Sequence, residues 1–139
     1  MALQAITIED RRYDAARREV DFIKKYIFPG SNIPSVTALC TAASGTELRL
    51  VQANEIGLHY AETLRRWRMN FSEKLDRIHA LGFDERFTRL WDFYFCYCEG
   101  GFLEGAIGDV QLAFTKSRAV ATVPLWKPRR AREASGAAA

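Results

Sequence analysis

Three stretches of the chain carry apolar and β-branched residues in alternation, the pattern typical of half-buried strands. They are residues 3–8 (LQAITI), 48–53 (LRLVQA) and 109–115 (DVQLAFT). In the third stretch Val110 and Phe114 belong to a series of apolar residues at every second position. The pattern therefore predicts three strands.

Between these stretches, apolar residues recur every three or four positions, which is the spacing of one face of an α-helix. The predicted helices run from Tyr13 to Phe28, from Ser35 to Gly45, from His59 to Leu81 and from Asp84 to Phe102. Ser35 and Asp84 are the candidate N-caps of the second and fourth helices. The fourth helix has a wide aromatic stripe, so we expect it to be well buried.

The order β-α-α-β-α-α-β predicts an α/β architecture, because strands alternate with helices along the chain. Three strands make a thin sheet for that much helix, and in a complete doubly wound domain they would be the last strands. A strand that begins at residue 3 needs partner strands, so we expect further strands upstream. The unpaired edge predicts poor solubility or self-association of the chain alone.

Charge divides the chain into two parts. The 139 residues include 20 Lys and Arg and 17 Asp and Glu, for a formal net charge of +3. Residues 116–139 hold six of the basic residues and a single acidic one, so the rest of the chain is slightly acidic. We expect 1–116 to be the folded part and 117–139 a basic, disordered tail. The acidic body disfavours a nucleic-acid binder, since such domains carry a basic face.

The cysteines and the N-terminus bear on the compartment. Three cysteines, an odd number, argue against a secreted disulfide framework. Cys96 and Cys98 form C-x-C with no matching second pair, so we expect no metal site. MALQAITIED lacks the basic region and long apolar core of a signal peptide, and no stretch of the chain has the composition of a membrane span. We predict a cytoplasmic protein, at most peripheral to the inner face of the membrane.

Five segments together resemble the C-terminal half of the cyclopropane-fatty-acyl-phospholipid synthases and mycolic acid cyclopropane synthases. They read LQAITIED, DFIKKYIFPGSNIPSVTAL, EIGLHYAETLRRWRMNF, ERFTRLWDFYFCYCEGGF and IGDVQLAF. The resemblance covers about residues 3–116, and its most specific parts surround KYIFPG and GLHYAETL. It implies the C-terminal half of a class I S-adenosylmethionine-dependent methyltransferase with a Rossmann-like fold.

The resemblance also implies a reaction. Members of this family transfer a methylene group from S-adenosylmethionine to a cis double bond of a phospholipid acyl chain. Methyl transfer to the alkene leaves a carbocation, and loss of a proton closes the ring, with a bound bicarbonate as the base. Aromatic faces nearby can stabilise the cation through their quadrupoles. Phospholipid acyl chains and a membrane surface are therefore the expected partners.

Four residues correspond to the family's active site. Tyr60 matches the catalytic tyrosine whose hydroxyl holds the bicarbonate, and Gln4 and Ile6 match the strand positions that line the same ion. Many relatives have His in place of Gln4, and an amide can donate a hydrogen bond but cannot titrate. Cys98 matches a cysteine often present near the family's active site.

Two parts of the family's site have no counterpart in this chain. The glutamate and first cysteine around the bicarbonate belong to the N-terminal half, as does the glycine-rich turn that binds S-adenosylmethionine. This chain has no G-x-G motif. We therefore expect a fragment that alone neither binds the cofactor tightly nor turns over. The competing hypothesis is a non-catalytic interaction module that pairs with a separate cofactor-binding chain or with lipid.

Each of these residues also has a purely structural interpretation. Tyr60 fits the core stripe of its helix, and Cys98 fits a buried, inert thiol. His59 fits an exposed position at the helix N-terminus. Four aromatic residues fit either core packing or an acyl-chain tunnel: Trp67, Trp91, Tyr94 and Phe95.

The charges on the third helix fit a solvated face. Three of its arginines could alternatively contact anionic headgroups: Arg65, Arg66 and Arg68. Glu62 with Arg66 and Glu73 with Arg77 have the i,i+4 spacing of helix ion pairs.

Overall fold

The computed structural model of the chain describes residues 1–116 and has three strands and six helical segments there. These are β1 Ala2–Ile8, α1 Asp10–Arg18, the π-helix η1 Ile23–Ile27, α2 Val36–Ser44, β2 Leu48–Glu55, α3 Gly57–Ser72, α4 Leu75–Ala80, α5 Glu85–Leu103 and β3 Ile107–Lys116. All three predicted strands are present, and the α/β prediction is confirmed. The predicted tail, 117–139, lies outside the described residues.

The last strand occupies the centre of the sheet. The strand order is β1-β3-β2, and β3 is antiparallel to both neighbours. In the β1–β3 register, Ile6 lies opposite Asp109 and Gln4 opposite Gln111. Because residues directly opposite share a face of the sheet, these four side chains lie on the same side. Within residues 1–116, β1 and β2 are the edge strands of this sheet.

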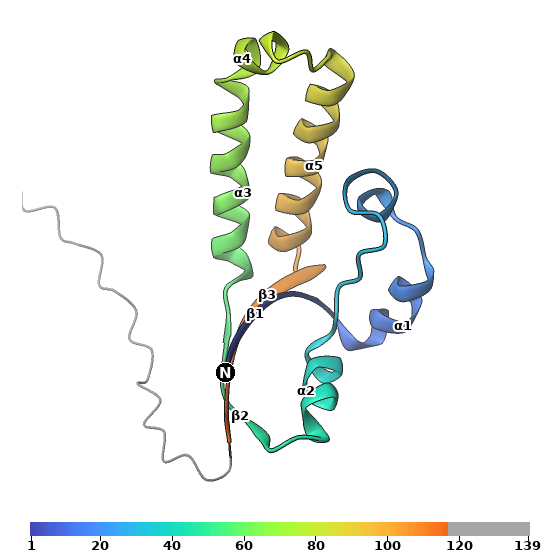
Figure 1. Ribbon diagram of the computed structural model, residues 1–139, viewed down its shortest axis with the longest axis vertical. Helices are drawn as coiled ribbons and strands as arrows, with labels where there is room; N and C mark the ends of the chain where they lie inside the picture. The colour runs from blue at the N-terminus through green and yellow to red at the C-terminus, as the bar shows by residue number, and fades with distance from the viewer. Residues whose placement is uncertain (117–139) are drawn as a thin grey trace, which may run out of the picture.

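Each face of the sheet carries its own apolar core. On one face α2 covers the alternating residues Val110, Leu112 and Phe114 of β3. On the other face α3 and α5 form an antiparallel hairpin whose buried core includes Leu64 and Phe95. Figure 1 shows this hairpin rising from the sheet, with α4 at its far end and α1 and α2 to one side. Helices therefore cover both faces of the three-stranded sheet.

The predicted helix over 13–28 is wrong, because the chain turns between α1 and η1. The Lys24 ammonium donates to carbonyls at the end of α1, that of Glu19 at 3.0 Å. The Asp21 carboxylate accepts from the Lys24 backbone N–H at 2.8 Å and so caps a new turn. Val20, an apolar residue in the middle of that predicted helix, is 73% exposed.

The predicted long helix 59–81 is also interrupted. It forms as α3 and α4, with Glu73 and Lys74 between them. The Glu62–Arg66 pair is formed at 2.7 Å, as its spacing predicts. No ion pair joins Glu73 to Arg77 among the described residues, because the break removes the helical spacing that would bring them together.

The two predicted N-caps are confirmed. The Asp84 carboxylate accepts a hydrogen bond from the Phe87 N–H at 2.9 Å, and the Ser35 hydroxyl accepts one from the Ala38 N–H at 3.1 Å. Each bond satisfies an N–H that the first turn of a helix leaves without an intrahelical partner.

We expect Asp84→Ala to lower the free energy of unfolding by about 1 kcal/mol, because the α5 cap is lost. Asp84→Ser is the matched control, since serine caps nearly as well as aspartate. Urea denaturation followed by circular dichroism measures both. Equal free energies of unfolding for Asp84→Ala and the unaltered chain would show that the cap does not stabilise the fold.

Gly57, the first residue of α3, is held by close contacts. A Cβ there would meet the Glu55 Oε1 at 2.7 Å and a Phe102 ring carbon at 3.3 Å. Glu55 could move only by giving up the bonds that it accepts from the N–H groups of Gly57 and Asp109.

Gly57→Ala is therefore expected to destabilise the fold by about 1–3 kcal/mol. Gly45→Ala is the matched control, because nothing lies within 4 Å of its would-be Cβ and its φ is −80°. Alanine at Gly45 should be neutral or slightly stabilising, since it restricts the unfolded chain. The same denaturation measurement compares the two, and similar effects would contradict the contact argument.

Candidate active site

The strand directions bring three chain segments together at one end of the sheet. Because β3 runs antiparallel to both neighbours, the ends of β1 and β2 meet the beginning of β3. A cavity of about 570 Å³ lies at this end of the sheet. Its lining includes Thr7, Glu55, Leu58, His59, Phe102 and Gly108. None of the four site residues expected from the family resemblance lines this cavity.

Those four residues instead converge beside the cavity, at the base of the α3–α5 hairpin. Ile6, Tyr60 and Cys98 all pack against the same buried cluster. Gln4 is two residues before Ile6 on the same face of β1 and bonds Asp109, which lies opposite Ile6. Residues from β1, α3 and α5, far apart in the sequence, are therefore neighbours in the fold.

Asp109 joins this group of residues, and the sequence analysis does not identify it. It is 1% exposed, and its Oδ2 accepts a hydrogen bond from the Gln4 side-chain amide at 2.8 Å. Its Oδ1 is buried with no hydrogen-bond partner among the described residues. Burial raises the pKa of this carboxyl, the Gln4 bond opposes that shift, and the Glu55 charge adds to it. The available signal was a lone charge in an otherwise uncharged strand, DVQLAFT.

Glu55 is a second residue missed from sequence. Its Oε1 accepts from the Gly57 N–H at 2.7 Å and from the Asp109 N–H at 3.1 Å. One carboxylate therefore connects the end of β2, the start of α3 and the start of β3. This fixes where α3 leaves the sheet and hence where Tyr60 lies.

Tyr60 lies three residues into α3, among aromatic rings. Its ring centroid is 4.9 Å from that of Phe102 and 6.2 Å from that of Trp67. Burial raises the pKa of its phenol first, and the nearby Asp109 carboxylate and Cys98 add to the effect. At neutral pH Tyr60 is therefore a protonated phenol that can donate a hydrogen bond.

Cys98 and Tyr94 form the α5 side of the group. Burial raises the pKa of the Cys98 thiol to about 11, against the lowering effect of a hydrogen bond with Tyr94. Burial, together with Cys98 and Tyr60, raises the pKa of Tyr94 to about 12. Because the thiolate is the reactive form, Cys98 is inert at neutral pH, which favours its structural interpretation.

The aromatic residues of the hairpin mostly face its interior. Trp91 and Tyr94 pack around the buried Phe95, with the Trp91 and Tyr94 centroids 5.2 Å apart. Trp67 is half exposed and contacts Tyr60, so the expectation of a buried core position fails for it. The aromatic stripe is thus continuous with the ring of Tyr60.

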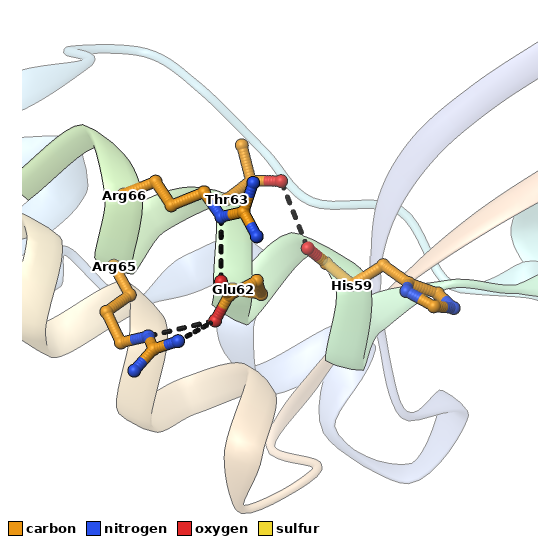
Figure 2. Close-up of polar contacts among 5 residues, drawn as sticks. All are labelled: His59, Glu62, Thr63, Arg65 and Arg66. Carbon is orange, nitrogen blue, oxygen red and sulfur yellow. Dashed lines mark hydrogen bonds and ion pairs between the residues drawn. The ribbon is translucent and has the colours of Figure 1, made fainter. Parts of the chain in front are cut away.

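The polar side of α3 is separate from this group. Figure 2 shows the Glu62 carboxylate between the guanidinium groups of Arg65 and Arg66, and the His59 imidazole pointing away from them. His59, Arg65 and Arg66 are exposed and Glu62 is partly exposed, as expected of a solvated face. Arg68 differs, because it bonds Asp92 of α5 at 2.7 Å and so ties the two helices together.

Two kinds of group can be tested against these residues. Gln4 and Tyr60 carry hydrogen-bond donors that suit a small oxyanion, and the Asp109 Oδ1 is an unused acceptor beside them. No cluster of His, Cys, Asp and Glu within residues 1–116 could hold a metal ion. No helix of this described part is long and apolar enough to cross a membrane.

Comparisons with known proteins bear on this geometry. The family described as "Mycolic acid cyclopropane synthetase" matches residues 1–112. The tuberculostearic acid methyltransferase of Mycobacterium tuberculosis is 45% identical over 112 residues, 80% of this chain and 26% of that protein. A protein of Pseudomonas putida described as "Probable fatty acid methyltransferase" is 30% identical over 96 residues, 69% of this chain and 24% of its own length.

A comparison of the fold with solved structures finds the same family. The mycolic acid cyclopropane synthase CmaA1, solved in complex with SAH and CTAB, superposes with a TM-score of 0.73 at 25% identity. That superposition covers 84% of this chain and 44% of CmaA1. The chain thus spans about a quarter of the curated relatives and less than half of the solved structure. It belongs to the mycolic acid cyclopropane synthetase family of S-adenosylmethionine-dependent lipid methyltransferases, and its fold corresponds to part of theirs.

Proposed function

We propose that this chain is the substrate-side part of an enzyme that transfers a one-carbon unit from S-adenosylmethionine to a cis double bond of a phospholipid acyl chain. The observation that carries the proposal is the convergence of Gln4, Ile6, Tyr60 and Cys98 at the base of one aromatic hairpin. These are the four positions that the family resemblance assigns to the active site.

The polar residues support an oxyanion site. Gln4 and Tyr60 can each donate a hydrogen bond, and Tyr60 remains protonated at neutral pH. Bicarbonate bound there supplies the base for the proton that a carbocation loses. Because Gln4 does not titrate, it holds and orients but relays no proton.

The aromatic rings support the other half of the reaction. A carbocation on the acyl chain is stabilised by the negative faces of aromatic rings. Tyr60, Phe102 and Trp67 present neighbouring rings beside the donors. The hairpin interior also excludes water, which would otherwise trap the cation.

A second outcome of the same chemistry is methyl transfer without ring closure. Two relatives are described as methyltransferases of tuberculostearic acid and of fatty acid, and neither description mentions a cyclopropane. Both outcomes begin with methyl transfer to the alkene and differ in the fate of the cation. The proposal therefore commits to the one-carbon transfer and treats cyclopropanation as its first form.

The short span of the match supports inactivity of the chain alone. The chain covers less than half of the solved structure that it resembles, and β1 offers an unpaired edge where further strands can add. The competing hypothesis is an interaction module that pairs with a cofactor-binding chain or with lipid. Such a module would pair through the same edge of β1 and would catalyse no reaction.

Calorimetric titration of the isolated chain with S-adenosylmethionine is expected to show no binding at micromolar concentrations. The reason is that the glycine-rich turn of the family has no counterpart here. The tuberculostearic acid methyltransferase serves as the positive control. Micromolar binding by the isolated chain would contradict the proposal that the cofactor site lies elsewhere.

Substituting this chain for the matched 112-residue segment of the tuberculostearic acid methyltransferase tests the activity itself. We expect the hybrid to transfer labelled methyl from S-adenosylmethionine to a cis-unsaturated phospholipid, read by mass spectrometry, which also distinguishes ring from branch.

In that hybrid, Tyr60→Phe should lower kcat by about tenfold or more, because a donor to the bound ion is lost. The matched control is Tyr26→Phe on η1, an exposed tyrosine outside the group, which should leave kcat unchanged. A hybrid that folds, binds cofactor and transfers nothing would favour the interaction module.

A further inference from the structure

The proposed site contains a buried charge that the reaction as described does not use. Asp109 is 1% exposed, and residues of three other elements act on it or are acted on by it. They are Gln4 from β1, Glu55 from β2 and Tyr60 from α3. Of these, only Gln4 donates a side-chain hydrogen bond to the carboxylate.

We propose that Asp109 is a positioning residue that holds the Gln4 side-chain amide as a hydrogen-bond donor toward a bound acceptor, beside the Tyr60 phenol. An ionised carboxylate can only accept hydrogen bonds, so the Gln4 end that faces it at 2.8 Å must be the amide nitrogen. The functional meaning of this role rests on the oxyanion site proposed above.

The other end of the Gln4 amide is fixed as well. Its Oε1 accepts a hydrogen bond from the Gln111 Nε2 at 3.1 Å. Gln111 lies directly opposite Gln4 in the β1–β3 register and two residues beyond Asp109 on the same strand. The Asp109 carboxylate therefore sets the orientation of the Gln4 amide and the Gln111 bond is compatible with it, and the second N–H of the Gln4 nitrogen has no partner within residues 1–116.

The same carboxylate acts on Tyr60 through its charge. A nearby negative charge makes a phenol harder to ionise, so the Asp109 charge raises the pKa of Tyr60 in the same direction as burial, which has the larger effect. The unused Oδ1 of Asp109 adds a condition on the ligand. A small acid anion that retains one O–H can supply that missing donor, whereas a fully deprotonated oxyanion cannot.

NMR of the full 139-residue chain tests the role without any assay of activity. As the Asp109 carboxyl is titrated, the side-chain amide signals of Gln4 should move with the same midpoint. The amide of Gln52, on the other edge strand, is the internal control and should not follow. Gln4 signals that ignore the Asp109 titration would overturn the proposal.

Asp109→Asn gives an independent readout, because asparagine has a similar shape and no charge. The pKa of Tyr60, read from its ring Cζ signal, should fall, while that of Tyr94 should stay near 12. A general loosening of the fold would lower the pKa values of both tyrosines, whereas loss of the Asp109 charge should lower that of Tyr60 alone. The matched control is Asp14→Asn on the exposed face of α1, which should change neither pKa.

A folded Asp109→Asn variant with unchanged Gln4 side-chain amide signals and an unchanged Tyr60 pKa would overturn the proposal, because the carboxylate would then act on neither group. If that variant does not fold, the titration of the unaltered chain decides alone. Addition of 13C-bicarbonate tests the oxyanion site separately. This addition is made to the hybrid with the tuberculostearic acid methyltransferase, because the other residues around the ion belong to the half that this chain lacks. Gln4 signals that follow Asp109 in the isolated chain but do not respond to bicarbonate in the hybrid would leave the positioning role standing and contradict the proposed ligand.

Discussion

The position of β3 between β1 and β2 is the constraint on which the rest of the structure depends. Hydrogen bonded on both sides, β3 sets the register of the whole sheet and presents one face to α2 and the other to the α3–α5 hairpin. Its first residues also meet the ends of both neighbours, so Asp109 and Glu55 are close only because of this order. Without it the site residues of β1 and α3 have no common neighbour.

A buried carboxylate links the fold to the chemistry. Removing Asp109 from water is unfavourable, and a single amide compensates for only part of that cost. The charge in turn faces the nitrogen of Gln4 and fixes it as a donor. The same arrangement that costs stability thus gives an amide donor of fixed polarity near the protonated Tyr60 phenol and its aromatic neighbours. Such a combination suits a site that binds a small oxyanion next to a developing cation.

Local signals in the sequence predicted much of the fold. Alternation gave the three strands, and Asp84 marked the start of α5 because capping needs only its own turn. The break at Asp21 was missed because Lys24 closes α1 through a long side chain that no periodicity reveals. Asp109 was missed for a different reason. A carboxylate in a strand is exposed or buried according to its neighbours, and the topology decides which residues these are. Tyr60 likewise fits a core position by its spacing, and it was the family resemblance that placed it in a site.

The central claim is that the β1–β3 register assembles the site. The most direct measurement is the set of cross-strand nuclear Overhauser contacts between these two strands in the folded chain. The account predicts Ile6 opposite Asp109 and Gln4 opposite Gln111. A slip of one residue would turn every β1 side chain to the other face. Contacts placing Ala5 opposite Asp109 would therefore contradict it.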